Sequence, residues 1–148
     1  MINSFTGDYD FLSNYYNCYP PIEWEGISYP TVEHAYQAAK TTDMILRRSI
    51  ASFDTPGKAK RAGKSLLIRP NWDHIRISIM TDLLILKFKK IGLKLQLINT
   101  SPHELVEGNY WHDNFWGSCT CSACSRVIKH NELGKILMMI RDSTIFSK

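Results

Sequence analysis

Long apolar runs are missing from this sequence of 148 residues, and so is a leader of the secretory kind. No window approaches the roughly 20 consecutive apolar residues that a membrane-spanning helix needs. The first residues, Met1 to Asn17, carry Asp8 and Asp10 and lack a basic start followed by an apolar stretch. We therefore expect a cytoplasmic protein with no membrane partner.

Repeats, low-complexity tracts and linker-like runs are also missing, so no domain boundary is indicated. Hydrophobic residues make up 44% and charged residues 22% of the chain, which is near the average of globular proteins and excludes a disordered or fibrous class. We expect one domain over residues 1–148. The net charge of +4 suits ligands that carry phosphate, but it is smaller than in dedicated nucleic-acid binders. No signal for the oligomeric state is visible.

Cysteines are few, and they lack the paired Cys-x-x-Cys units of most zinc sites. Cys119, Cys121 and Cys124 form one Cys-x-Cys-x-x-Cys cluster, and Cys18 is distant in the sequence. We interpret them as small apolar residues and expect no metal ligand and no cofactor. The alternative is a structural metal whose tetrahedral site Cys18 completes. A catalytic thiol is not favoured, because no local Cys–His pair is encoded and His130 is a candidate only by proximity.

One segment, Glu107 to Gly117, is dense in polar and aromatic groups and has no hydrophobic periodicity. It holds two carboxylates, a histidine, two asparagines and four aromatic rings. Such a mixture is typical of a pocket, because a core helix or strand separates polar from apolar positions. We interpret the segment as an active-site loop. An aromatic surface patch for a protein partner is the alternative.

The region before this loop predicts a hairpin followed by a series of helices. Ile22 to Tyr29 alternates around Glu25-Gly26, which predicts two short strands with apolar Ile22, Trp24, Ile27 and Tyr29 on one face. Thr31 can cap a helix that runs toward Lys40. On that helix Glu33, Tyr36, Gln37 and Lys40 share a face, which is either solvated or directed at a ligand.

Further helices are indicated by caps and apolar spacing. Thr55-Pro56 starts a helix that carries the basic residues Lys58, Lys60, Arg61 and Lys64, which either contact phosphate or form a solvated face. The buried positions of the longest helix are expected to include Ile75, Ile79, Leu83, Leu86 and Ile91, with Gly92 as its stop. The expected helices are Asp43 to Ser52, Asn71 or Trp72 to Ile91, Leu93 to Ile98 and Glu132 to Arg141, and a strand is expected over Glu104 to Glu107. The fold class is therefore α+β, a compact and mostly helical domain with a few short strands.

The carboxylates of the loop and of the first helix suit chemistry at a glycosidic bond. Such reactions pass through a cationic state that one carboxylate stabilises while a second group protonates the leaving group or activates water. Glu107 and Asp113 in the loop, and Glu33 and Lys40 on the helix, are candidates for these roles. Their spacing in the sequence alone does not show that these side chains reach the same sugar.

Several motifs, in order along nearly the whole chain, resemble those of the NADAR family, also called YbiA-like. They comprise Asp10 to Tyr16, Gly26 to Lys40, Thr55-Pro56-Gly57, Arg69-Pro70-Asn71-Trp72, Leu105 to Asn109, Trp111-His112-Asp113, Phe115-Trp116-Gly117 and Asn131 to Met138. The resemblance implies the YbiA-like fold and an N-glycosidase that hydrolyses the bond between an amine and C1 of a phosphorylated ribose.

Two substrate classes follow from the resemblance. The first is the set of phosphoribosylamino-pyrimidine intermediates of riboflavin synthesis, small phosphoribosylated molecules. The second is ADP-ribose attached to guanine bases, which would make ADP-ribosylated nucleic acid a partner. A catalytically silent module that binds ADP-ribose or another nucleotide is the third reading, and the presence of Glu33, Lys40 and Asp113 speaks against it.

The resemblance also implies roles for individual residues. Glu33 is assigned as general acid or base, Asp113 as the group that orients ribose or stabilises charge at C1, and Lys40 as a candidate nucleophile. Substrate binding is assigned to Trp72, Trp116, Asn14, Asn109 and Trp111. Tyr110 and Phe115 are expected to serve packing.

The chain departs from the family pattern in two places. Lys89-Lys90-Ile91-Gly92 replaces a polar stretch that many relatives carry, and this leaves the substrate choice open. The cysteine cluster lies directly after Trp116-Gly117 and is expected to shape the mouth of the pocket, with or without a metal.

Overall fold

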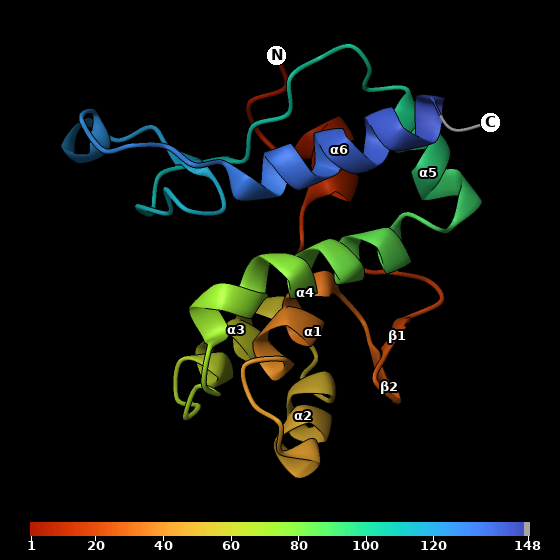
Figure 1. Ribbon diagram of the computed structural model, residues 1–148, viewed down its shortest axis with the longest axis vertical. Coiled ribbons are helices and arrows are strands. Elements are labelled where there is room, and N and C mark those ends of the chain that lie inside the picture. Colours follow the sequence, from red (N-terminus) through yellow and green to blue (C-terminus); the bar gives the residue numbers. More distant parts are fainter. Residues whose placement is uncertain (147–148) are drawn as a thin grey trace. The chain divides into compact units, whose positions relative to one another are not determined.

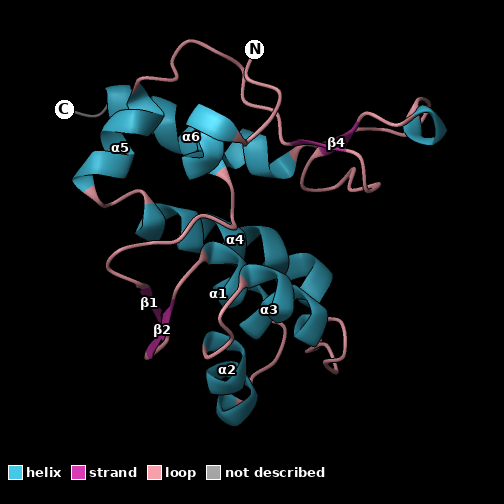
Figure 2. Ribbon diagram, turned by 180° about the vertical axis from the view of Figure 1, so that it is seen from behind, coloured by secondary structure: helices cyan, strands magenta, loops and turns pink. Residues whose placement is uncertain are grey.

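The computed structural model describes residues 1–146, and helices connected by loops and two short strand pairs make up the chain (Figure 1). Helices dominate and strands are short, which confirms the expected α+β class (Figure 2). In chain order the elements are η1 (Gly7–Leu12), β1 (Ile22–Trp24), β2 (Ile27–Tyr29), α1 (Val32–Ala38), α2 (Met44–Ala51), α3 (Pro56–Gly63), α4 (Trp72–Lys87), α5 (Ile91–Ile98), β3 (Gly108–Asn109), β4 (Ser118–Cys119), η2 (Ser122–Cys124) and α6 (Glu132–Phe146).

The predicted hairpin is present, with β1 and β2 antiparallel and Ile22 opposite Tyr29. Its two-residue turn places Glu25 at φ 48° and Gly26 at φ 83°. Both angles lie in the left-handed region that a type I′ turn requires at its two central residues. Ile22, Ile27 and Tyr29 are buried, so the hairpin packs its apolar face inward as predicted.

The predicted helix caps are also confirmed. The Thr31 hydroxyl accepts a hydrogen bond from the backbone N–H of His34 over 3.1 Å, and Thr55 accepts one from Lys58 over 3.2 Å. The Asp43 carboxylate caps α2 in the same way. Each side chain accepts from an N–H that has no partner within its helix. α1 ends at Ala38, so Lys40 lies just beyond the helix rather than on it.

The prediction for the longest helix was wrong at its end. α4 stops at Lys87, and Ile91 starts α5 with 67% of its surface exposed. Gly92 therefore lies inside α5 and does not stop a helix. Of the expected core positions, only Leu83 is fully buried, and the other buried residues of α4 are Trp72, Met80, Leu84 and Lys87. The apolar spacing continues past Lys87, but the chain passes there from one packing unit to another.

The expected strand over Glu104 to Glu107 was wrong as well. Only Leu105 pairs, in an isolated parallel bridge with Ile2. The regular ladder comes later, where β3 pairs with β4 in parallel and Asn109 lies opposite Cys119. The local residue preferences favour a strand here. A strand also needs a neighbouring segment to pair with, and only Ile2 pairs with this segment.

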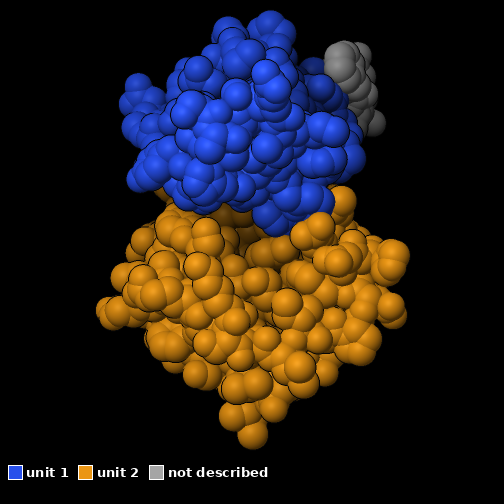
Figure 3. Space-filling model, turned by 90° about the vertical axis from the view of Figure 1, so that its left-hand side faces the viewer, with its two compact units in different colours: residues 1–13, 88–148 blue, residues 14–87 orange. Residues whose placement is uncertain are grey.

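Contacts divide the chain into two compact units, shown in different colours in Figure 3. Unit 1 comprises residues 1–13 and 88–148, and unit 2 comprises residues 14–87. That residues 1–148 fold as one domain stays a prediction. Within residues 1–146, no helix combines the length and the apolar character needed to cross a bilayer.

Each unit has its own core. In unit 2, α1 packs against α2, α3 and α4, and every residue of α1 is buried. In unit 1, α5 packs against α6, and Leu105, which lies between these two helices in the sequence, is fully buried. The buried apolar residues that belong to unit 1 include Phe5, Phe11, Leu12, Phe88, Leu93, Leu97, Leu133, Ile136 and Leu137.

Candidate active site

The polar face of α1 is buried, which rules out the solvated alternative. Glu33 is 8% exposed, Tyr36 6% and Gln37 3%. A buried carboxylate loses hydration and needs compensating partners, so a fold that keeps one inside has a structural or chemical use for it. The shared face predicted from helical spacing is therefore an interior one.

The Glu33 carboxylate is held by its own helix. Nε2 of Gln37 donates to Oε1 of Glu33 over 2.8 Å, one turn further along. The backbone N–H of Glu33 donates to the carbonyl of Asn14 over 3.1 Å. These two bonds fix both the orientation of the carboxylate and its distance from the loop that carries Asn14.

Asn14 stands beside Glu33 with an unused acceptor. Its Nδ2 donates to the sulfur of Met80 over 3.6 Å, whereas Oδ1 is buried and has no hydrogen-bond partner among residues 1–146. A buried acceptor without a partner costs about 1–3 kcal/mol. A ligand hydroxyl or amine that reached this oxygen would recover that energy. The role of Asn14 in substrate binding stays a prediction.

Lys40, Tyr36 and Trp72 form a cluster at the end of α1. The Lys40 amine lies 5.7 Å from the centre of the Tyr36 ring, and the Tyr36 and Trp72 rings are 5.3 Å apart at an interplanar angle of 49°. Burial lowers the pKa of Lys40, and the charge of Glu33 acts in the opposite direction. Cations over aromatic faces are stabilised by the ring quadrupole, so the cluster holds its amine in place.

Lys60 of α3 and Lys64, the residue that follows α3, also act on Lys40. The charges of Lys60 and Lys64 lower the pKa of the Lys40 amine further, which places them within electrostatic reach of it. Lys58 instead pairs with Asp54 over 2.8 Å. The basic helix predicted from the sequence therefore divides into a side associated with Lys40 and a side occupied by a surface ion pair.

A surface depression of about 410 Å³ adjoins this cluster through Trp72. Arg69 lines it, and its backbone N–H donates to the carbonyl of Lys40 over 2.8 Å. Sequence reasoning assigned no role to Arg69 or Asn71, although both belong to the motif that contains Trp72. Their position next to an assigned residue was the available signal. The depression is lined by Ile68, Arg69, Asn71, Trp72, Asp73 and His74.

His34 lies on α1 but is occupied by structural bonds. Its Nδ1 is 2.7 Å from the Thr31 hydroxyl and its Nε2 is 2.9 Å from the Phe53 carbonyl. Because a carbonyl only accepts, Nε2 carries the proton and Nδ1 accepts from Thr31. Burial lowers the pKa of His34, and the hydrogen bond to Phe53 opposes this shift. The ring therefore stays neutral and ties α1 to the segment before α3.

In unit 1, the loop Glu107 to Gly117 is organised by Asn109. The Asn109 side chain is 4% exposed, and its Nδ2 donates to the carbonyl of Asp113 over 2.8 Å. Its Oδ1 accepts from the backbone N–H groups of Trp111 and Asp113. These bonds give Asn109 a scaffolding role. The predicted contact of Asn109 with substrate stays a prediction.

The loop is held at its two ends by the β3–β4 pair and, further along, by the first turn of α6. The carbonyls of Phe115 and Trp116 accept from the N–H groups of Glu132 and Leu133, each over 3.0 Å. Gly117 is required because a Cβ there would collide with the Glu107 carbonyl and the Asn109 amide. Free N–H groups at a helix start are thus used to hold the loop.

Asp113 is half-buried and fixes the turn that follows it. Its Oδ1 accepts from the N–H groups of Phe115 and Trp116 over 3.1 and 2.9 Å. No hydrogen bond within residues 1–146 uses Oδ2. One oxygen of the carboxylate is therefore structural, and the other is available for a ligand.

The aromatic residues of the loop differ in exposure. Trp116 is half-buried and packs edge-to-face on Phe115 with ring centres 4.8 Å apart, and Trp111 is 49% exposed. Tyr110 is 76% exposed, and its ring packs edge-to-face on that of Trp111 with centres 5.1 Å apart. Phe115 does pack, against both Trp116 and His130.

The predicted site residues fall into two groups, one in each unit. Unit 2 contains Asn14, Glu33, Lys40 and Trp72. Within it, the charge of Glu33 acts on the amine of Lys40. Asn109, Trp111, Asp113 and Trp116 belong to unit 1 and are gathered by the loop. A buried carboxylate, an amine of lowered pKa and aromatic rings are the groups of an enzyme that uses acid–base and nucleophilic chemistry.

Comparison with known proteins defines the class more closely. The chain is 32% identical to the N-glycosidase YbiA of Escherichia coli over 152 residues, which covers 98% of this chain and 88% of that protein. An N-glycosidase of Nostoc punctiforme is 32% identical over 138 residues, covering 86% of this chain and 85% of the relative. The NMR structure of E. coli YbiA superposes with a TM-score of 0.79 at 30% identity, over 98% of this chain and 87% of that one.

The NADAR domain model matches residues 3–144, and the chain belongs to this family. The N-glycosidases among its relatives are hydrolases that act on N-glycosyl bonds, and we place the chain in the same class of enzyme. A riboflavin biosynthesis protein of Vibrio vulnificus is 33% identical over 138 residues, which covers 91% of this chain and 35% of that longer protein.

Proposed function

We propose that this protein hydrolyses the bond between an exocyclic amine and C1 of a phosphorylated ribose. The observation that carries the proposal is the association of the buried Glu33 carboxylate with the Lys40 amine, whose pKa burial lowers. A carboxyl group that transfers protons and an amine that attacks carbon are the two groups that cleavage of an amine–ribose bond requires.

Glu33 acts as the general acid and base. A ribosylamine opens to an imine, and the amine nitrogen must gain a proton before it leaves C1. Glu33 supplies that proton and later takes one from the water that adds to C1. The overall reaction consumes one water and yields the free amine and the ribose phosphate. Gln37, bonded to Oε1, keeps the carboxylate aimed during both steps.

Lys40 acts as the nucleophile. Its neutral amine adds to C1 of the imine, and the departure of the amine product leaves a Schiff base between Lys40 and the sugar. Water then adds to C1 and releases the lysine. A lysine reacts only in its neutral form, so burial and the charges of Lys60 and Lys64 favour the reaction by lowering the pKa of Lys40.

The surroundings of Lys40 suit a phosphorylated sugar with a flat base. Lys60, Lys64 and Arg69 supply positive charge for the phosphate, and Trp72 offers a ring on which a base can stack. The Oδ1 of Asn14 can accept from a ribose hydroxyl. In unit 1, Asp113 is proposed to orient ribose or stabilise charge at C1, and Trp111, Trp116 and Asn109 to contact the substrate, on the family resemblance.

The substrate we propose is a phosphoribosylamino-pyrimidine of the kind formed in riboflavin synthesis. Two relatives support it by name, the Vibrio vulnificus protein and a chloroplastic riboflavin biosynthesis protein of Zea mays, which is 29% identical over 131 residues. ADP-ribosylated guanine shares the same amine–C1 bond and is the competing substrate.

The deciding experiment offers both substrates to the purified protein and measures the release of ribose 5-phosphate or ADP-ribose. We expect turnover of the pyrimidine substrate, and loss of about 10²-fold or more in kcat for Glu33→Gln. Glu23→Gln, an exposed glutamate of the hairpin, is the matched control and should keep full activity. Faster turnover of ADP-ribosyl-guanine would overturn the substrate, and full activity of Glu33→Gln would overturn the mechanism.

A further inference from the structure

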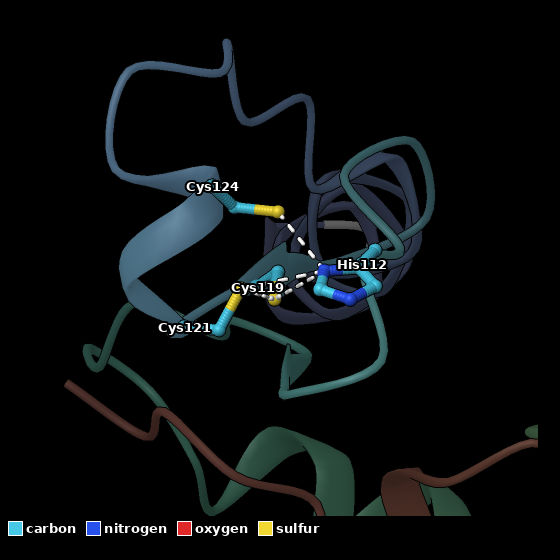
Figure 4. Close-up of side chains that lie close together, drawn as sticks. All are labelled: His112, Cys119, Cys121 and Cys124. Carbon is cyan, nitrogen blue, oxygen red and sulfur yellow. Dashed lines mark hydrogen bonds between the residues drawn. The ribbon is translucent and has the colours of Figure 1, made fainter.

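Four potential metal ligands converge, one inside the loop Glu107 to Gly117 and three just after it (Figure 4). Nδ1 of His112 lies 3.3 Å from the sulfur of Cys121 and 3.3 Å from that of Cys124. The Cys119 sulfur is 3.9 Å from the same nitrogen and 3.3 Å from the Cys121 sulfur. All four ligand atoms lie within 4.8 Å of one another.

Local backbone geometry brings these side chains together. Cys121 directly precedes the short 3-10 helix η2 and Cys124 is its last residue, and the N–H of Cys124 donates to the Cys121 carbonyl over 3.2 Å. Cys119 lies on β4 opposite Asn109, at the base of the loop. His112 has φ 70°, a left-handed conformation that a non-glycine residue adopts at a cost. Its imidazole Nδ1 faces the cysteines.

We propose that His112, Cys119, Cys121 and Cys124 bind one zinc ion. A tetrahedral zinc with Zn–S near 2.3 Å and Zn–N near 2.05 Å separates its ligands by about 3.6 Å for N to S and about 3.8 Å for S to S. The three N–S separations, 3.3, 3.3 and 3.9 Å, lie on either side of the N–S value. The S–S separation between Cys119 and Cys121, 3.3 Å, is shorter than the S–S value, and the whole set lies within 4.8 Å. Thiolates together with an imidazole are the ligand set of structural zinc sites.

The alternative considered from the sequence was a metal site with Cys18 as its fourth ligand. In the structure the fourth ligand beside Cys119, Cys121 and Cys124 is His112. Cys18 belongs to unit 2, whereas the four converging ligands all belong to unit 1. The second Cys-x-x-Cys unit that seemed to be missing is replaced by His112 and Cys119, which are brought together by the loop and the β3–β4 pair.

The charge around the cluster fits a metal–thiolate centre. Three thiolates and one Zn²⁺ leave a net charge of −1, and Lys129 donates from its Nζ to the carbonyl of Cys124. A positive group beside the ligands offsets that charge and helps to fix the turn that bears Cys124. On binding, the thiols release their protons to water, and no electron is transferred.

Four protein ligands leave no open position on the metal, which assigns the site a structural role. His112 directly precedes Asp113, and the backbone N–H of Cys119 donates to Oδ1 of Asn114 over 2.9 Å. Zinc would therefore clamp both ends of the segment that carries Asp113 and Trp116. The metal proposal stands on unit 1 geometry and does not depend on the proposed reaction.

The test is the metal content of the full chain, produced without a histidine tag in zinc-supplemented medium and then dialysed. We expect about one zinc per chain, a loss of most of it in Cys121→Ser, and full retention in Cys18→Ser. Reconstitution with Co²⁺ should give the visible absorption of a tetrahedral thiolate site. Cys121→His, which keeps a ligand, should retain metal and shift that absorption even if Cys121→Ser fails to fold.

Two results would overturn the site. One is wild-type protein that retains no zinc and no cobalt, including the case in which mass spectrometry finds a disulfide among these cysteines. The sulfurs of Cys119 and Cys121 are 3.3 Å apart, well beyond the roughly 2.05 Å of a disulfide bond. The other is equal zinc content in Cys121→Ser and Cys18→Ser, because that would place the metal elsewhere.

Discussion

Gln37 donates a hydrogen bond to the Glu33 carboxylate over 2.8 Å, and α3 closes over the donor at Gly63. A Cβ at Gly63 would overlap the Oε1, Cδ and Cβ atoms of Gln37. Both α1, which carries Gln37, and α3, which packs against Gln37 at Gly63, therefore orient the Glu33 carboxylate. α3 approaches α1 closely only because position 63 has no side chain.

Gly63→Ala should accordingly impair both stability and activity. The added methyl forces Gln37 to move, and overpacking of this kind costs about 1–3 kcal/mol in the free energy of unfolding. Turnover should fall as the Glu33 carboxylate loses its donor. Urea denaturation and kcat are the measurements.

Gly57→Ala, on the same helix, is the matched control. A Cβ at Gly57 would meet only the Arg61 guanidinium at 3.9 Å, which is an ordinary contact. This variant should be neutral or more stable by about 0.5 kcal/mol. Equal behaviour of the two variants would show that the contact between Gly63 and Gln37 has no energetic role.

The activity should depend on pH through the neutral amine of Lys40. Burial lowers the pKa of Lys40 from 10.5, so the neutral form persists to lower pH than for an ordinary lysine. Activity falls as pH drops through that lowered pKa. Lys64→Gln removes a charge that helps to lower it, so the acid limb of kcat should move to higher pH.

Lys58→Gln is the charge-matched control for that profile, because Lys58 is paired with Asp54 and is not among the charges acting on Lys40. The acid limb of the kcat profile of Lys58→Gln should coincide with that of the wild type. Borohydride added during turnover should attach the sugar to Lys40 and fail to do so in Lys40→Arg. A limb that moves equally in both glutamine variants would count against Lys40 as the titrating group.

Two substitutions of Asp113 should separate its structural role from its chemical role. Asp113→Asn keeps an oxygen that can accept from Phe115 and Trp116, so the free energy of unfolding should change by less than about 0.5 kcal/mol. Activity should still fall by about 10²-fold through loss of the charge. Asp113→Ala loses both bonds and should cost about 1–2 kcal/mol more.

Full activity of Asp113→Asn would remove Asp113 from the catalytic assignment. Equal stability of the alanine and asparagine variants would instead show that the two backbone bonds contribute nothing. Thermal unfolding and initial rates on the same preparations distinguish these cases.

Arg47 should be a major contributor to the stability of unit 2. It is 3% exposed, donates to the Thr41 carbonyl and to Glu25 over 2.8 and 2.6 Å, and lies 4.8 Å from the Trp24 ring centre. Arg47→Ala removes all three interactions, and we expect a loss of about 2–4 kcal/mol. The outer partner, Glu25, is 54% exposed and stays hydrated when left alone.

The neighbouring Arg48→Ala is the control. Arg48 is exposed, so its removal should change the free energy of unfolding by no more than about 0.5 kcal/mol. Urea midpoints of the two variants that coincide would mean that the buried guanidinium contributes no net stability.

Local features of the chain were readable from the sequence. The Glu25-Gly26 turn and the caps at Thr31 and Thr55 depend on a few neighbouring residues, and each formed as predicted. The family motifs were equally local, which is why they identified the family. Backbone preference and capping act over one turn, so the sequence by itself determines them.

Tertiary structure decided which of these residues are buried and which side chains meet. The polar face of α1 became interior because α3 and α4 cover it, and Ile91 became exposed because α4 ends at Lys87. His112 joined three cysteines through a left-handed residue and a two-residue ladder. Burial and convergence depend on partners distant in the sequence, and no window of the chain contains that information.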